Sequence, residues 1–202
     1  LMLSNEIRKE IISLMKREVV PALGCTEPTA VSLCVAKATE LLGEEPAGIE
    51  VLLSPNILKN AMGVGIPGTG MIGLPIAVAL GALIGRSEYG LEVLRDVDPA
   101  AVERGKEYIS RDAIRIGLCE NPPSILHIEV TVKGKSGNYA KAVISVSHTN
   151  FVYLEHDGEV LLDRIGECGG VSHGDSADRE LDMATVYDFA MTAPLDEISF
   201  IL

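Results

Sequence analysis

Apolar residues in the first part of the chain recur every three or four positions, which is the spacing of one face of a helix. One such helix is predicted over residues 4–20, with Ser4 as its N-cap. A second begins near Thr26, and Gly43 stops it because glycine readily takes the left-handed conformation that ends a helix. Residues 1–47 are therefore expected to form an N-terminal helical segment.

The middle of the chain alternates between strand and helix patterns. Residues 48–54 predict a strand, and residues 56–62 predict a short helical turn. A glycine-rich loop then leads to an uncharged apolar segment from Met71, which predicts a buried helix, and polar helices follow across 88–110. Residues 48–165 are thus expected to form an α+β core. The further strands predicted within it cover 114–118, 125–133, 139–148, 151–155 and 160–165.

The last part of the chain, residues 166–202, predicts a polar loop and then a helix over 177–191 with Ser176 as its N-cap. A further apolar segment follows, and the sequence ends inside it, which is typical of the front part of a longer polypeptide. The expected fold class is α+β, with N-terminal helices, a buried helix after the glycine loop and a mostly antiparallel sheet. Residues 1–202 are interpreted as the N-terminal part of a larger catalytic chain whose C-terminal helical half is missing.

Charge and composition narrow the class of protein. The formal net charge is −12, from 29 acidic and 17 basic residues, so nucleic acid is not expected as a partner because its phosphates would be repelled. The uncharged stretch at 60–85 raises the question of a membrane span, but its glycines and prolines interrupt any helix long enough to cross, so no membrane partner is expected. Four widely spaced cysteines without a secretion signal favour the reducing cytoplasm.

Cys25 is the first candidate for chemistry. It lies between Gly24 and a helix-starting Thr-Glu-Pro sequence, where unpaired backbone N–H groups and the positive end of the helix dipole would stabilise a thiolate. This placement suits a metal ligand or a reactive thiol. Glu27 is expected to cap the helix rather than to act in catalysis. Cys34 lies on the apolar face of the same helix and is interpreted as a small core residue.

Two neighbouring segments could bind a small ligand. Asn56, Lys59 and Asn60 share one face of the short helix and could hold the carboxylate and amine of a small amino or hydroxy acid; the alternative is a solvated helix start. The N–H groups of the glycine loop at 63–70, together with Thr69, could cradle a carboxylate; the alternative is tight packing against the next helix. The loop has the letters of a dinucleotide fingerprint, but no strand leads directly into it, so a nucleotide site is not expected.

The histidines are weaker candidates. His148, in the Ser-His-Thr-Asn sequence at 147–150, is predicted to face inward at the end of a strand, as an acid, a base or a hydrogen-bonding group for substrate; a core histidine is the alternative. His127 has no partner that the sequence identifies. Cys168 and His173 supply two ligands at a spacing that matches no zinc module, so no metal site is expected there.

The motif at 24–28, the segment 56–75 and the shorter tetrapeptide at 147–150 resemble the L-cysteine desulfidase family, relatives of the iron-sulfur L-serine dehydratase alpha chain. The resemblance spans nearly the whole chain. It implies a carbon–sulfur lyase of amino-acid catabolism that depends on an oxygen-sensitive [4Fe-4S] cluster and not on pyridoxal phosphate. Such an enzyme converts L-cysteine into pyruvate, ammonia and sulfide.

Carried over residue by residue, the resemblance makes Cys25 the first cluster ligand, and the other ligands are expected in the C-terminal half. The chain alone would then lack a complete cluster site and would be inactive. The site residues are assigned on this basis. Lys59 and His148 are expected to be catalytic, and substrate binding is expected of Asn56, Asn60, Gly68, Thr69, Gly70, Thr149 and Asn150.

Two other functions stay open. An iron-sulfur dehydratase acting on L-serine or a hydroxy acid would use the same site with a different leaving group. A non-catalytic ligand-binding or regulatory module would use the glycine loop alone. Release of sulfide or of water separates the first two, and absence of iron from the full-length protein would favour the third. The expected partner is a small amino acid, and a homo-oligomer is left open.

Overall fold

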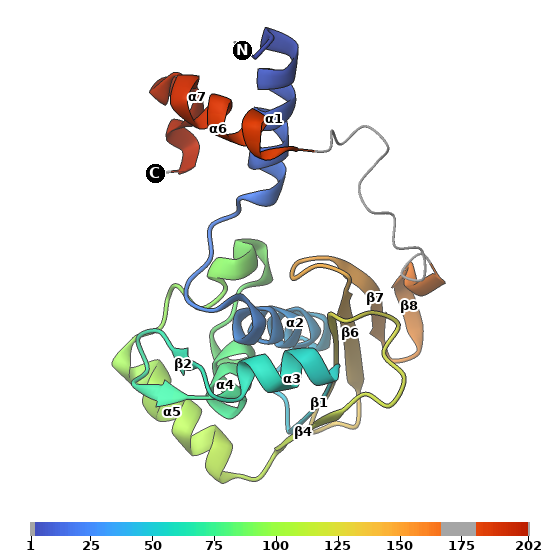
Figure 1. Ribbon diagram of the computed structural model, residues 1–202. Coiled ribbons are helices and arrows are strands. Elements are labelled where there is room, and N and C mark those ends of the chain that lie inside the picture. The colour runs from blue at the N-terminus through green and yellow to red at the C-terminus, as the bar shows by residue number, and fades with distance from the viewer. Residues whose placement is uncertain (1–2, 167–180, 202) are drawn as a thin grey trace. The chain divides into compact units, whose positions relative to one another are not determined.

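The computed structural model describes residues 3–166 and 181–201. They form two units, one built from residues 22–166 and one from residues 3–21 and 181–201 (Figure 1). The N-terminal helical segment expected at 1–47 is thereby divided between the two units. Its first helix belongs to the smaller unit and its second helix to the larger one.

The smaller unit is entirely helical in its described residues. Its elements are α1 (Asn5–Glu18), α6 (Met183–Thr192), α7 (Leu195–Ile198) and the short 3-10 helix η3 (Ser199–Ile201). α1 begins as predicted, because Ser4 Oγ accepts a hydrogen bond from the Ile7 N–H at 3.3 Å. Arg8 of α1 donates a hydrogen bond of 3.0 Å to the carbonyl of Thr192, so α1 and α6 contact each other.

The helix predicted over 177–191 starts later than expected. α6 begins at Met183 because Asp182 provides the N-cap, its Oδ1 accepting a hydrogen bond from the Thr185 N–H at 2.6 Å. The cap that the sequence suggested, Ser176, lies outside the described residues.

The helices of the larger unit agree with the periodicity of the sequence. They are α2 (Thr26–Leu42), α3 (Pro55–Ala61), α4 (Leu74–Leu83), the 3-10 helix η1 (Ser87–Glu92) and α5 (Pro99–Ser110). α2 ends where predicted, because Gly43 has a φ of 77° in the left-handed region. α4 is the expected buried helix, and it packs between α2 and α5. Its all-apolar sequence suits a helix covered on every side.

One six-stranded sheet forms the other layer of this unit. Its spatial order is β4 (Ile114–Leu118), β1 (Gly48–Leu53), β5 (His127–Lys133), β6 (Tyr139–Ser145), β7 (Phe151–His156) and β8 (Glu159–Asp163). β4 pairs with β1 in parallel, and the other neighbours are antiparallel. A separate small hairpin joins β2 (Gly65–Ile66) to β3 (Met71–Ile72). The α+β class with a mostly antiparallel sheet is therefore confirmed.

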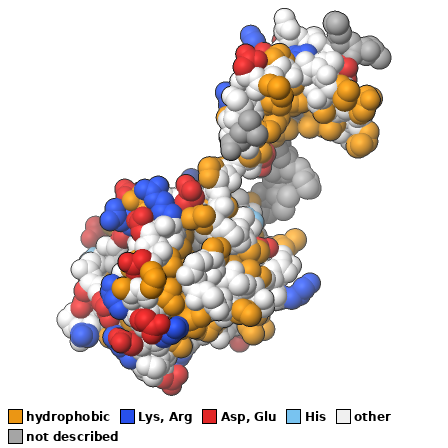
Figure 2. Space-filling view, turned by 90° about the vertical axis from the view of Figure 1, so that its left-hand side faces the viewer, with side chains coloured by type: hydrophobic (Ala, Val, Ile, Leu, Met, Phe, Trp, Pro, Cys, Tyr) orange, Lys and Arg blue, Asp and Glu red, His pale blue; other side chains and the backbone are white. Residues whose placement is uncertain are grey.

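The core lies between α2 and one face of the sheet (Figure 1). Alternate residues such as Val51, Val130 and Ala142 point toward α2 and are fully buried. The remaining residues of the same strands form the opposite face, where charged side chains such as Glu50 and Lys133 are exposed. Figure 2 shows charged side chains gathered over one part of this unit and hydrophobic or uncharged surface over another.

Several strand ends differ from the sequence-based expectation; β8, for example, ends at Asp163 and not at residue 165. β6 ends at Ser145 and not at His148, because Val146 has a φ of 75°, which lies outside the β region of the backbone. β5 begins at His127 and not at residue 125, because the preceding residues form a loop. Among the described residues, no helix is both long enough and apolar enough to cross a membrane.

Close packing of α2 on α4 gives a testable result. A Cβ atom on Gly81 of α4 would lie 2.7 Å from the carbonyl oxygen of Ser32 in α2, which is too close without a backbone shift. We expect Gly81→Ala to lower the free energy of unfolding by about 1–3 kcal/mol. Gly63→Ala is the matched control, because no heavy atom lies within 4 Å of its added Cβ. Urea unfolding of both variants checks this, and equal losses would contradict the close approach.

Candidate functional site

Cys25 lies at the N-terminus of α2, as the sequence predicts. It is the N-cap residue, its backbone is extended, and its side chain makes no capping hydrogen bond. The side chain is partly exposed. Its Sγ lies 3.0 Å from Oε2 of Glu27, to which the thiol donates a hydrogen bond. The thiol is therefore accessible and held in place by a carboxylate.

Glu27 connects Cys25 to α3. Its Oε2 also accepts a hydrogen bond from the hydroxyl of Thr26 at 3.3 Å, and its Oε1 accepts one from Nδ2 of Asn60 at 3.2 Å. Sequence reasoning gave Glu27 only a capping role, whereas the structure gives it three side-chain partners. The signal that could have found it is its position two residues after Cys25 in a turn that also begins a helix.

Glu27 changes the pKa of the Cys25 thiol in the direction opposite to the one expected from the sequence. The hydrogen bond to the Glu27 carboxylate, together with partial burial, raises the pKa of the Cys25 thiol above its ordinary value. The same hydrogen bond lowers the pKa of Glu27. The sequence-based expectation of a stabilised thiolate at the helix N-terminus is wrong for this arrangement, because the hydrogen bond to the Glu27 carboxylate and partial burial favour the protonated thiol.

Glu27→Gln is therefore expected to lower the pKa of Cys25. The amide removes the negative charge and can donate a hydrogen bond to a thiolate, so alkylation of Cys25 should reach its half-maximal rate at a lower pH. Iodoacetamide labelling followed by peptide mass spectrometry at several pH values measures this directly. Cys34 is fully buried and serves as an internal control that stays unlabelled in the folded protein. An unchanged pH profile for Cys25 would contradict the contact.

The glycine loop lies against the Cys25 turn. Gly24 has a φ of 82°, and a Cβ there would lie 2.6 Å from Cγ of Pro67. Only glycine allows this approach between the two segments. The two longest motifs of the sequence, far apart along the chain, therefore meet in space, because Pro67 contacts Gly24 and Asn60 contacts Glu27.

The loop is shaped from within by Thr69. Its hydroxyl donates to the Ile66 carbonyl at 2.7 Å and accepts from the Met71 N–H at 3.0 Å, and its side chain is buried. Thr69 therefore holds the turn together, which differs from the direct ligand contact that the sequence suggested. Gly68 and Gly70 are exposed in left-handed conformations, with φ of 76° and 64°, so their backbone remains accessible.

α3 presents two of the three predicted polar residues to solvent. Asn56 and Lys59 are exposed, and neither side chain has a hydrogen-bond or ion-pair partner among the described residues. Asn60 is half-buried and holds the Glu27 carboxylate. α3 therefore has the polar face that the spacing predicts. Its residue Asn60 is linked to Cys25 because both side chains donate hydrogen bonds to the Glu27 carboxylate.

The Ser-His-Thr-Asn segment belongs to a different place in the fold. His148, Thr149 and Asn150 lie in the turn between β6 and β7, where Asn150 Nδ2 donates to the Ser145 carbonyl at 3.0 Å. His148 is half-buried, outside the strand from which it was expected to point inward. In the described part of the chain, no hydrogen bond or ion pair joins residues 148–150 to Cys25 or to α3.

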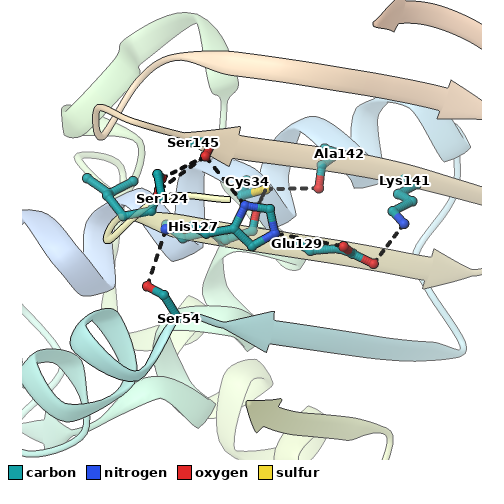
Figure 3. A network of polar contacts seen from close by, with 10 residues as sticks. Cys34, Ser54, Ser124, His127, Glu129, Lys141, Ala142 and Ser145 are labelled. Carbon is teal, nitrogen blue, oxygen red and sulfur yellow. Dashed lines mark hydrogen bonds and ion pairs between the residues drawn. The ribbon is translucent and has the colours of Figure 1, made fainter. Parts of the chain in front are cut away.

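A polar network that the sequence did not identify lies at the ends of β5 and β6 (Figure 3). His127 is buried, its backbone N–H donates to Ser54 Oγ at 3.3 Å, and its Nδ1 lies 3.5 Å from Ser145 Oγ. Glu129 lies 2.7 Å from Lys141 and 3.9 Å from Nε2 of His127. The period-two alternation along β5 places His127 and Glu129 on one face, as the sequence predicts, whereas Lys141 joins them only through the register of β5 on β6.

Comparison with known proteins gives a consistent result. The chain is 57% identical over 201 residues to a UPF0597 protein of Phocaeicola vulgatus, an alignment that covers 100% of the chain and 46% of that protein. It is 60% identical over 195 residues to one of Bacteroides fragilis, covering 96% and 45%, and 44% identical over 204 residues to one of Porphyromonas gingivalis, covering 99% and 47%. The chain belongs to the UPF0597 family. No family model matches it.

The chain spans about half the length of the curated UPF0597 relatives it matches. The names of these relatives specify no activity.

The described residues of this UPF0597 chain do not form a complete metal site. No group of three or more histidine, cysteine or acidic side chains within them could hold a metal ion. Cys34 is buried in the core, where its thiol donates to the Ala142 carbonyl at 3.3 Å and burial raises its pKa. Cys168 and His173 lie outside the described residues. Cys25 alone therefore does not fit an iron-sulfur cluster, and further ligands would have to come from elsewhere.

Proposed function

We propose that this chain is part of an iron-sulfur-dependent lyase that cleaves a small amino acid by β-elimination, with L-cysteine giving pyruvate, ammonia and sulfide. One observation carries the proposal. The two segments on which the resemblance to L-cysteine desulfidases mainly depends contact each other, through Gly24 with Pro67 and through Glu27 with Asn60. Unrelated surface segments would have no reason to be joined by both a glycine-only approach and a charged hydrogen bond.

The substrate would lie beside α3 and the glycine loop. The ammonium of Lys59 and the amide of Asn56 are free to bind a carboxylate, and the exposed backbone at Gly68 and Gly70 can approach the same group. Asn60 would act indirectly, by holding Glu27. Leu23, Met62 and Ile72 are exposed apolar residues on these same segments, which suits a site that is covered when the protein is complete.

The reaction balances without a redox step. A base removes the α-proton, the electron pair forms the Cα–Cβ double bond, and sulfide leaves from Cβ. The aminoacrylate product then takes up water and yields pyruvate and ammonia. Lys59 on α3 is the base that we propose to test. His148, the other predicted catalytic residue, lies in the turn between β6 and β7, and no hydrogen bond of the described residues joins it to this site. Cys25 would be one cluster ligand, and the remaining ligands would lie outside the described residues.

Product analysis tests the proposal. The full-length protein, purified without oxygen, is incubated with L-cysteine and separately with L-serine, and pyruvate, ammonia and sulfide are measured. Equal amounts of the three products from L-cysteine would support the proposal. Pyruvate and ammonia from L-serine alone would indicate the dehydratase alternative, and no product from either would favour a ligand-binding module.

A further inference from the structure

A depression in the surface lies at the opposite end of β1 from α3. It has a volume of about 330 Å³ and is open to solvent. β1, β4 and β5 form its floor, together with the turn that follows α5. β1 has six residues, so its two ends are about 17 Å apart, and the depression is separate from the Cys25 site. Its charged lining residues are Glu50, Asp112, Arg115 and Lys133.

Within the described residues, these four charged side chains are unpaired. Glu50 lies directly across from Arg115 on β4 and from Thr131 on β5, yet no hydrogen bond or ion pair of the described residues involves the side chains of the four lining residues. In an adjoining depression, by contrast, the charged residues are paired, because Nη1 of Arg111 lies 2.8 Å from Oε1 of Glu45. Two cations and two carboxylates are thus free to bind a ligand from solvent.

Asp112 is held at the rim in an unusual conformation. Its φ is 55°, and its N–H donates to the Ile109 carbonyl at the end of α5 at 3.2 Å. Glycine adopts this left-handed geometry at the end of a helix with less strain than an aspartate does. Position 112 thus carries an aspartate where glycine would be less strained, and the aspartate side chain borders the depression.

We propose that this depression binds a small zwitterion, specifically a free α-amino acid. Its carboxylate would bind Arg115 and Lys133, and its ammonium would bind Glu50 and Asp112. A simple anion would be repelled by the two carboxylates and a simple cation by the two basic groups, so only a ligand with both charges satisfies all four. The proposal does not depend on the β-elimination activity, because it uses none of the residues of the Cys25 site.

Glycine, the smallest zwitterion, is the probe that tests this. Titration of the isotopically labelled 202-residue chain, followed by amide NMR, should give saturable shifts at Gly48 and Ala113 in the depression. Asp112→Gly should weaken glycine binding by about tenfold or more, because a hydrogen bond to a charged group is lost. This variant relieves the strain at φ 55°, so its thermal stability should be equal or higher, and lost binding would not reflect unfolding.

The controls separate this site from the Cys25 site. Lys59→Gln should leave the shifts at Gly48 and Ala113 unchanged, whereas Arg115→Gln should weaken them. Acetate and methylammonium, each carrying one charge, should bind at least about tenfold more weakly than glycine. Equal binding of acetate or methylammonium, shifts confined to α3 and the glycine loop, or unchanged affinity in Asp112→Gly would overturn the proposal.

Discussion

Acidification from pH 5 to pH 2 is expected to remove up to about 3 kcal/mol of folding free energy that Glu129 contributes. His127 and Lys141 lower the pKa of Glu129 to about 2, from an ordinary value of 4.5. Lys141 makes the closer contact, at 2.7 Å against 3.9 Å for Nε2 of His127. Glu129 is only 24% exposed, so solvent screens these interactions incompletely.

The loss of folding stability at low pH follows from the direction of the Glu129 pKa shift. Because the folded pKa lies below the unfolded one, the carboxylate stabilises the fold fully above about pH 5, and this stabilisation is lost as the pH falls toward 2. Urea unfolding of the wild type and Glu129→Gln at several pH values measures it. The difference between them should shrink as the pH falls. Glu107→Gln, at an exposed helix position, is the control, and a constant difference for Glu129→Gln would contradict the network.

Replacement of Lys59 by methionine is expected to lower kcat/KM for L-cysteine by about 10- to 100-fold in the full-length protein. This range corresponds to the loss of one hydrogen bond to a charged group in the transition state. Lys59 is exposed and has no partner in the described residues, so its loss should leave the unfolding temperature unchanged. A rise in KM with constant kcat would show that Lys59 only binds substrate, whereas a fall in kcat would show a role in the chemical step.

Lys106→Met is the matched control for Lys59→Met. Lys106 is also exposed, and its partner is Glu103 on the same helix, so its loss should not change the reaction. A change of less than twofold in kcat/KM for both variants would remove α3 from the proposed site.

The sequence predicts local structure where a single segment determines it. The caps at Ser4 and Gly43, the buried character of α4 and the period-two strands all follow from residues close in sequence. The end of β6 was missed because it depends on the left-handed backbone at Val146, which a β-branched residue gives no reason to expect. The pairing of β4 in parallel with β1 also depends on long-range contacts.

The sequence predicts which residues belong to the candidate site, but it does not predict the contacts between them. The sequence identified Cys25, the polar face of α3 and the glycine loop separately. Their contact depends on the absence of a side chain at Gly24 and on the Glu27 side chain reaching Asn60. The same long-range dependence explains why the raised pKa of Cys25 could not be foreseen, since the helix dipole alone suggested the opposite.

We propose that Cys25 is a ligand of an iron-sulfur cluster in the full-length protein. Iron and acid-labile sulfide are measured in the protein purified without oxygen, for the wild type, Cys25→Ala and Cys119→Ala. Cys119 is a half-buried cysteine whose side chain has no hydrogen bond to Cys25 or Glu27 among the described residues, and it serves as the control. We expect iron and sulfide in the wild type and Cys119→Ala, and their loss in Cys25→Ala. A wild type without iron, or a Cys25→Ala variant that retains its iron fully, would contradict a cluster bound by Cys25.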